Sequence, residues 1–324
     1  MTVVLDVQDL CTSFHTRGGV VKAVNGVSFS LRKGEVLGLV GESGSGKTVT
    51  GFSLLGLVDA PGRIDRGRII LNGQDLVGLP ERELRKRRGR DIAMIFQDPI
   101  ATLNPLLSIR TQMKMALDAH GSLSAAASER RCVEVLDKVG IPDPRSRLDN
   151  YPHEFSGGMR QRVAIAIALL HNPSVIVADE PTTALDVSIQ AQILHEMRNL
   201  AQETGTALIW ISHDLATVSS LASRLLVMYA GRVVEEGPTA EVLNDPQHPY
   251  TRGLIDSLPA TAEPGKPLRQ IPGTTPSLLS LGEGCPFKPR CAHASDQCDK
   301  APDVAVLKDR AWRCHHPLAM ERAV

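Results

Sequence analysis

The sequence "GESGSGKT" occupies residues 41–48 and directly follows the apolar stretch "EVLGLV" at residues 35–40. It matches G-x-x-x-x-G-K-[ST], a glycine-rich loop whose backbone N–H groups converge on phosphate oxygens. The alternative is an ordinary glycine-rich turn. An aliphatic strand before the loop and a helix-compatible sequence after it favour the phosphate loop, because the helix N-terminus adds a positive dipole end. The pattern therefore predicts an α/β fold built around a phosphate-binding loop.

The composition limits the class of protein. The chain has 324 residues, 42% of them apolar, which is enough for one large domain with an appendage or for two domains. Its 36 basic residues balance 36 acidic residues, which argues against general attraction to nucleic acid or an anionic membrane. No apolar run is long enough to span a bilayer, and the first residues lack the pattern of a signal peptide. We therefore expect a soluble, cytoplasmic protein with reduced thiols.

Strand-like and helix-like segments alternate through the first three quarters of the chain. The expected strands are residues 35–41, 91–97, 174–180 and 207–213. The last three are near-continuous aliphatic runs, as expected for strands covered on both faces. Residues 187–203 have helical periodicity, with apolar side chains at Ile189, Ile193, Met197 and Leu200. Residues 224–237 predict a hairpin that turns at Ala230 and Gly231.

Three other segments differ from these in periodicity, charge or proline content. Residues 105–150 are helix-like with polar breaks, and they predict a helical insertion. The basic run from Arg82 to Arg90 is expected to be a solvated helix face or loop rather than a phosphate-binding surface, because the chain as a whole is neutral. From Pro259 onward prolines are frequent and periodicity stops, which predicts an irregular, extended tail.

Several side chains near the loop and the strand ends suit phosphate chemistry. Lys47 can place its ammonium on the terminal phosphates, and Thr48 can offer a hydroxyl to Mg²⁺. The stretch "VIVADE" ends in Asp179, which can hold Mg²⁺ through its water shell, and Glu180, which can take a proton from the attacking water. The acidic pair could equally be a helix N-cap. His213 ends another expected strand, where it can sense a γ-phosphate.

The stretch "FSGGMRQR" at residues 155–162 predicts a second anion-binding site. Ser156, Gly157 and Gly158 would open a helix whose first N–H groups are free to bind an anion. One nucleotide cannot easily use both this helix end and the loop at 41–48 unless the second site comes from another subunit. The sequence therefore predicts that two chains share each nucleotide.

The order of these motifs resembles the ATP-binding subunit of an ABC transporter. The phosphate loop, "FQDP" with Gln97, "FSGGMRQR", "VIVADE", "ALD" with Asp186 and "SHD" follow one another over residues 3–255. The resemblance implies a P-loop ABC ATPase with a mixed or parallel core sheet and a helical subdomain inserted at about residues 98–162. It also implies a dimer with two nucleotides sandwiched between the chains, each phosphate loop facing the partner's signature segment, which in this chain is Ser156–Met159.

The resemblance also implies site residues. Those expected to bind ATP are Phe14, which would stack on adenine, together with Gly41, Glu42, Ser43, Gly44, Ser45, Gly46, Lys47, Thr48, Gln97 and Asp179. Thr48, Gln97 and Asp179 would hold Mg²⁺. Ser156, Gly157, Gly158 and Met159 would contact the partner's ATP. Glu180 and His213 are the expected catalytic residues, and Asp186 would couple the two sites.

Longer stretches resemble the importers of dipeptides and oligopeptides. These are "FQDPIATLNP", "TTALDVSIQAQIL" and "HPYTRGLIDSLP", and the form "FSGGMRQR" is similar to the first of that family's two ATPases. The implied partners are a second ATPase subunit that is a different chain, two transmembrane permeases and an extracytoplasmic peptide-binding protein, with this chain at the cytoplasmic face of the membrane. No nucleic-acid partner is expected. Nickel and glutathione importers share much of the pattern. ABC ATPases of translation or DNA repair usually carry two ATPase domains or a long coiled coil, and neither is visible.

Four of the six cysteines lie close together, at Cys285, Cys291, Cys298 and Cys314. The spacing C-x₅-C-x₆-C-x₁₅-C lacks the C-x₂-C pairs typical of zinc sites, and the alternatives are a metal site and a set of reduced thiols. Residues 259–324 resemble the C-terminal extension of the same ATPases, which implies a [4Fe–4S] cluster, with Zn²⁺ as the alternative and the tail as a possible redox or metal sensor. His293, His315 and His316 could substitute as ligands. Cys11 and Cys132 are expected to be buried. We therefore expect an ATPase domain at 1–258 and a cysteine-rich extension at 259–324.

Overall fold

The computed structural model describes residues 2–183, 185–259 and 269–318. The chain divides into two compact units, each of which is described by itself. One unit consists of residues 5–31, 36–77 and the chain from Trp210 onward, and the other consists mainly of residues 78–209. The first part of the expected proline-rich tail, residues 260–268, lies outside the described residues.

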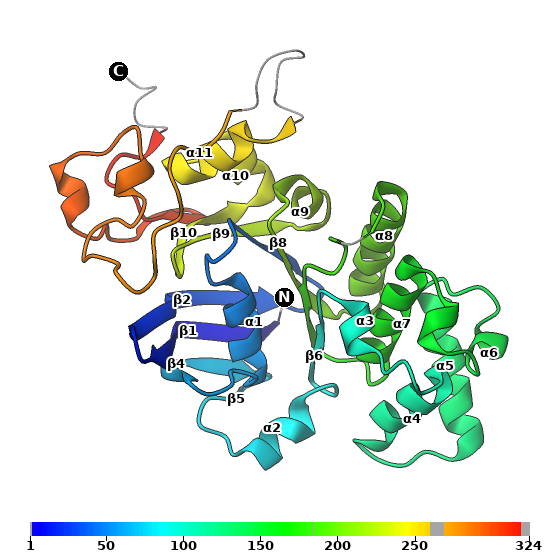
Figure 1. Cartoon of the computed structure of the whole chain (residues 1–324). Coiled ribbons are helices and arrows are strands. Elements are labelled where there is room, and N and C mark those ends of the chain that lie inside the picture. Colours follow the sequence, from blue (N-terminus) through cyan, green and yellow to red (C-terminus); the bar gives the residue numbers. More distant parts are fainter. Residues whose placement is uncertain (1, 184, 260–268, 319–324) are drawn as a thin grey trace. The chain divides into compact units, whose positions relative to one another are not determined.

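The unit that contains the phosphate loop has two sheets (Figure 1). The first is antiparallel with the order β2-β1-β4-β5, formed by Gly19–Arg32, Val3–Thr16, Gly62–Leu71 and Gln74–Asp75. The second is mixed and contains β3 (Val36–Val40), β9 (Arg224–Tyr229), β10 (Arg232–Pro238), β12 (Arg310–Trp312) and β11 (Ala305–Leu307). β3 is parallel to β9, whereas β9 and β10 form an antiparallel hairpin. The mixed sheet expected for the fold is confirmed.

Helices of the same unit are short, and several follow strands directly. They are α1 (Lys47–Leu55), α9 (Leu215–Leu221), α10 (Thr239–Asn244), α11 (Pro249–Asp256) and the 3₁₀ turns Lys288–Arg290 and Asp296–Asp299. The expected hairpin turn is confirmed, because Ala230 and Gly231 have φ values of 47° and 80° and connect paired Tyr229 and Arg232. Two residues with positive φ give the tight turn whose twist suits a hairpin.

The cysteine-rich tail is more ordered than the sequence predicts. Its strand β12 pairs with β10, with Glu235 opposite Trp312, and β11 pairs with β12. Arg310 in β12 is buried and donates to the fully buried carboxylate of Glu235. Glu235 also accepts the backbone N–H groups of Gln247 and His248. The tail therefore extends the mixed sheet and shares its polar network.

The other unit, mainly residues 78–209, is largely helical (Figure 1). Its strands β6 (Ile92–Ile95) and β7 (Val175–Asp179) are parallel, and its helices are α2 (Glu81–Arg87), α3 (Pro99–Thr102), α4 (Ile109–Asp118), α5 (Ala125–Lys138), α6 (Pro144–Arg147), the 3₁₀ turn Pro152–Glu154, α7 (Gly157–Leu169) and α8 (Val187–Thr204). β8 (Ala207–Ser212) lies where the chain passes from this unit into the other.

Two smaller expectations are also confirmed. α2, which carries most of the basic run, has no buried residue, and Arg87 and the C-cap residue Arg88 form ion pairs with Asp91 and Glu81. Cys11 and Cys132 are buried, with 9% and 2% exposure. Among the described residues, no helix has the length and apolar character needed to cross a bilayer.

Candidate functional site

The phosphate loop leaves the fully buried strand β3 and folds back on itself. Gly41 and Gly46 have φ values of 151° and 101°, a conformation that L side chains rarely adopt. A Cβ atom on Gly41 would lie 2.2 Å from the carbonyl oxygen of Met228, and one on Gly46 would lie 2.2 Å from that of Ala23. Both positions therefore require glycine for conformation and for space.

Lys47 is the first residue of α1, and its ammonium folds back over the loop. Its Nζ donates to the carbonyl oxygens of Gly41 at 2.7 Å and Glu42 at 2.9 Å, and the residue is 5% exposed. The loop is further held by Ser45, whose carbonyl accepts the N–H of Gly231 at 2.9 Å. No side chain caps the start of α1, whereas Ser43, Gly44 and Thr48 are exposed. This arrangement combines a cation with the N-terminus of a helix, which suits an anion such as phosphate.

Two more predicted site residues belong to the same unit. Phe14 lies near the end of β1, where its ring packs against Gly62 of the paired strand; a Cβ atom on Gly62 would lie 2.7 Å from that ring. His213 follows β8 directly and is exposed. Asp214 caps α9 by accepting the N–H of Ala216 at 2.9 Å, so the residue after His213 begins a helix.

In the helical unit, Gln97 and Glu180 follow neighbouring parallel strands. Ile95 of β6 pairs with Ala178 of β7, so the chain beyond both strands emerges at the same edge. The Gln97 amide donates to Glu180 Oε2 at 3.1 Å, and Asp179 at the end of β7 is 4% exposed. The Asp179–Glu180 pair does not cap a helix, because Asp186 caps the next one, α8. The structure thus excludes the N-cap interpretation of the pair.

The signature segment opens α7 as the sequence predicts. Ser156 is the N-cap, and its Oγ accepts the N–H of Met159 at 3.3 Å. Ser156 and Gly157 are exposed, while Gly158 is buried so closely that a Cβ atom would lie 2.7 Å from Ile189. Glycine at 158 therefore lets the start of α7 approach α8.

Asp186 is fixed at the start of α8. Its carboxylate accepts the N–H of Ile189 at 3.0 Å and the hydroxyl of Ser188 at 2.7 Å. The backbone hydrogen bond, followed by the Ser188 hydroxyl, holds the pKa of Asp186 below its ordinary value. Asp186 is therefore ionised at neutral pH, and its carboxylate caps α8.

The four clustered cysteines come together in the extension without forming a recognisable metal site. The N–H of Cys285 donates to the carbonyl of Cys298 at 2.9 Å. Burial is the main cause that raises the pKa of Cys314 to about 12, and the neighbouring thiols of Cys285, Cys291 and Cys298 contribute to the same rise. Across the described residues, no group of three or more His, Cys, Asp or Glu side chains is arranged to hold a metal ion. The thiols are thus near enough to influence one another electrostatically.

Two of the candidate substitute ligands are engaged elsewhere. His316 Nε2 lies 2.7 Å from the hydroxyl of Ser295, and His315 Nε2 lies 3.1 Å from the carbonyl oxygen of Lys300.

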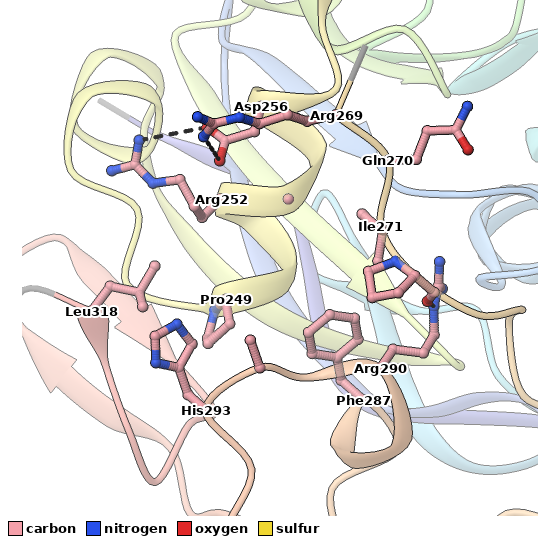
Figure 2. A pocket seen from close by; sticks show the side chains of 13 residues that line it. Pro249, Arg252, Asp256, Arg269, Gln270, Ile271, Phe287, Arg290, His293 and Leu318 are labelled. Atoms are coloured by element: carbon pink, nitrogen blue, oxygen red, sulfur yellow. Dashed lines mark hydrogen bonds and ion pairs between the residues drawn. The ribbon is translucent and has the colours of Figure 1, made fainter. Parts of the chain in front are cut away.

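A cavity of about 720 Å³ lies between α11, the segment Arg269–Pro272 and the turn that carries Phe287 (Figure 2). Arg252 and Arg269 both approach the carboxylate of Asp256, at 4.0 and 3.7 Å. Arg290 also lines the cavity. None of the residues predicted from the sequence to bind ATP lines it.

The comparisons with known proteins identify the class. The model of the ABC transporter family matches residues 24–183, and the model of the oligopeptide/dipeptide transporter C-terminal region matches residues 234–298. Among solved structures, the dimeric bacterial ABC transporter cassette MJ0796 has a TM-score of 0.65 at 26% identity, covering 72% of this chain and 98% of that one. The chain therefore belongs to the ABC transporter ATPases.

The curated relatives show to which branch of the ABC family the chain belongs. The oligopeptide transport ATP-binding protein OppD of Escherichia coli K12 is 50% identical over 97% of this chain and 93% of its own length. The dipeptide transport ATP-binding protein DppD of Bacillus subtilis 168 is 48% identical over 95% and 93%. Within the ABC family, the chain belongs to the ATP-binding proteins of oligopeptide and dipeptide transporters, and it couples ATP hydrolysis to transport.

Proposed function

We propose that the loop at residues 41–48 binds the phosphates of the ATP whose hydrolysis powers the import of dipeptides or oligopeptides. The observation that carries this proposal is the loop itself, in which Lys47 lies over the carbonyls of Gly41 and Glu42 at the uncapped start of α1. Backbone N–H groups and a lysine ammonium are the donors that bind nucleotide phosphates in P-loop proteins. Phe14 is assigned to the adenine ring, which an aromatic face can stack on.

The catalytic step is assigned to Glu180. Its Oε2 is oriented by the Gln97 amide at 3.1 Å and by the Thr183 hydroxyl at 3.2 Å, which holds a carboxylate ready to accept a proton from water. His213 is assigned to the γ-phosphate. Thr48, Gln97 and Asp179 offer the hydroxyl, amide and carboxylate oxygens that Mg²⁺ prefers, and Mg²⁺ neutralises charge on the phosphates.

The variant Glu180→Gln tests this assignment in the transporter assembled with its partners. It removes the base and keeps the shape, so we expect ATP to bind with unchanged affinity while turnover falls at least about 100-fold. Glu203→Gln, an exposed change near the end of α8, is the matched control and should keep full activity. Near-normal ATPase activity of Glu180→Gln would show that another group takes the proton.

The sharing of each nucleotide between two chains is also proposed. Ser156 caps α7 and Gly157 begins it, and both are exposed, which suits contact of the segment Ser156, Gly157, Gly158 and Met159 with an ATP bound to a partner chain. Asp186 is assigned to coupling between the two sites. We infer that the partner ATPase is a different chain, and that two permeases and an extracytoplasmic peptide-binding protein complete the assembly at the cytoplasmic face of the membrane.

Co-purification tests this assembly. A tagged chain expressed with its candidate partners should retain two hydrophobic permeases and a second ATPase. Recovery of the chain as a homodimer with no permease would favour a non-transport ABC ATPase. Binding of nickel or glutathione, rather than peptides, by the associated extracytoplasmic protein would move the assignment to one of those importers.

We further propose that Cys285, Cys291, Cys298 and Cys314 hold a [4Fe–4S] cluster, with Zn²⁺ as the alternative. Four thiols suit either group, and the proposal is supported by the all-cysteine set and by the hydrogen bond from the Cys285 N–H to the Cys298 carbonyl at 2.9 Å, which joins two of its members. Analysis of the metal and acid-labile sulfide content of anaerobically purified protein distinguishes the cluster, Zn²⁺ and the reduced thiols. About four irons with matching sulfide support the cluster, one zinc supports the alternative, and no metal leaves four reduced thiols.

A further inference from the structure

A residue of the extension holds the side chain of Glu42, the second residue of the phosphate loop. Arg290 Nη1 donates to Glu42 Oε2 at 2.6 Å, and Nη2 donates to Oε1 at 2.9 Å. The Arg290 side chain is 5% exposed and that of Glu42 is 28% exposed. Two parallel charge-assisted bonds in a mostly dry site fix orientation as well as distance.

The guanidinium of Arg290 makes further contacts with a backbone carbonyl and a tyrosine hydroxyl. Arg290 Nε donates to the carbonyl of Pro272 at 2.8 Å, and Nη1 lies 3.3 Å from the hydroxyl of Tyr229. Thr275, in the same tail, donates to Glu42 Oε2 at 3.3 Å. The extension therefore supplies a positioned cation and a hydroxyl to one carboxylate of the loop.

Glu42 is also part of the loop's backbone geometry. Its carbonyl accepts from Lys47 Nζ at 2.9 Å and from the N–H of Ser45 at 3.2 Å. Its N–H donates to the hydroxyl of Tyr250 at 2.8 Å. A shift of the Glu42 side chain would therefore move the carbonyl that orients the Lys47 ammonium.

Aromatic packing joins the extension to β9 and α11. The ring of Phe287, which belongs to the turn before Arg290 (Figure 2), lies 5.3 Å from that of Tyr229 and 5.4 Å from that of Tyr250. Tyr229 and Tyr250 are fully buried, and Phe287 is 3% exposed. The extension thus completes a buried aromatic cluster whose tyrosine hydroxyls contact Glu42 and Arg290.

We propose that Arg290 is a positioning residue for ATP binding, which acts through Glu42 to hold the phosphate loop in its binding conformation. The inference rests on the proposed role of the loop and extends it to the C-terminal extension. Without the Arg290–Glu42 pair, ordering of the loop must be supplied by the binding energy of ATP, which lowers affinity. Among the described residues, the hydrogen bonds of Arg290 to the phosphate loop all go to the Glu42 carboxylate, so catalysis by bound ATP should change little.

The test uses Arg290→Gln in the full chain and in the assembled transporter. We expect the Kd and KM for ATP to rise about tenfold while kcat stays within about threefold. Lys288→Gln is the matched control, because this neighbouring cation in the same turn pairs with the exposed Asp299 at 2.6 Å. Its ATP affinity should equal that of the unchanged chain. Arg290→Lys, which can keep one of the two bonds, should recover part of the affinity.

A double-mutant cycle separates the proposed action from general destabilisation. Glu42→Gln breaks the same pair without altering the extension, so Glu42→Gln and the double variant with Arg290→Gln should have equal ATP affinities. Additive losses, or wild-type affinity of Arg290→Gln, would overturn the proposal. Lys47→Ala separates a failure of the loop assignment from a failure of the role given to Arg290. If Lys47→Ala keeps wild-type ATP affinity, the assignment of the loop fails. If Lys47→Ala loses ATP affinity while Arg290→Gln keeps it, only the role of Arg290 fails.

Discussion

The tight approach of Gly46 to the carbonyl of Ala23 permits a quantitative prediction for Gly46→Ala. The added Cβ would lie 2.2 Å from that oxygen, and real Cβ contacts stay beyond about 3 Å, so the loop must move by about 0.8 Å. Gly46 also has a φ of 101°, which costs an L residue roughly 1–2 kcal/mol. Overpacking against backbone adds about 1–3 kcal/mol. We expect the free energy of unfolding to fall by about 3 kcal/mol.

The matched control is Gly73→Ala, in the turn between β4 and β5. Gly73 has a φ of 83°, but no atom lies within 4 Å of its Cβ position. It therefore carries the conformational cost without the clash, and we expect a loss of about 1 kcal/mol. Chemical denaturation measures both values, and equilibrium binding of a fluorescent ATP analogue measures affinity.

Binding should distinguish the two variants more sharply than stability does. Gly46 precedes Lys47, so a displaced loop misplaces the ammonium, and we expect roughly 100-fold weaker ATP binding; Gly73→Ala should bind normally. If Gly46→Ala binds ATP with unchanged affinity, or costs no more stability than Gly73→Ala, the loop does not depend on the space that the structure gives it, and the reasoning is refuted.

Two further predictions concern buried polar groups. Arg162→Met breaks the 2.7 Å ion pair with Glu196 and a hydrogen bond to the Val139 carbonyl; since Arg162 is 6% exposed and Glu196 23%, we expect denaturation to show a loss of about 2–3 kcal/mol. Burial lowers the pKa of His248 to about 3, and its Nδ1 accepts the N–H of Tyr250. In the unfolded chain His248 is protonated below about pH 6.5, whereas in the folded chain it stays neutral. The free energy of unfolding therefore falls as the pH drops from 6.5 toward 3, by about 2 kcal/mol at pH 5 from this group. His248→Gln should remove that part of the pH dependence.

Controls for these two predictions come from the same chain. Lys138→Met removes an ion pair with Glu134 in which both side chains are more than 40% exposed, and it should cost less than about 1 kcal/mol. An equal loss for Arg162→Met would show that its burial contributes nothing. For His248, identical pH dependence in the unchanged chain and in His248→Gln would show that another group produces the acid sensitivity.

The parts of the fold that were predictable are those whose signal is local. β6, β7 and β8 are near-continuous aliphatic runs, β3 directly precedes the glycine-rich loop, and the motifs that follow these strands have fixed spacing. The antiparallel sheet of β1, β2, β4 and β5 was not predicted. Its strands are partly exposed, and the register of β1 shifts between Gln8 and Thr12, which interrupts the alternation that marks a strand.

The extension was harder to predict because its order comes from tertiary contacts. β12 has only three residues, too few for a periodic signal, and it forms because Glu235 and Glu236 of β10 pair with it. The contact between Arg290 and Glu42 joins residues 248 positions apart. Sequence patterns describe neighbouring residues and cannot predict a contact at that separation. The burial of Arg290 explains the contact, because a buried cation needs a carboxylate partner.

The central claim is that ATP bound by this loop drives transport, and Lys47→Ala tests it most directly. The measurement is ATP binding by the purified chain together with peptide uptake by vesicles that contain the assembled transporter. The account predicts loss of both, because the Lys47 ammonium is the loop's own cation for the phosphates and its stem is buried at the start of α1. Unchanged ATP affinity with normal uptake in Lys47→Ala would contradict it.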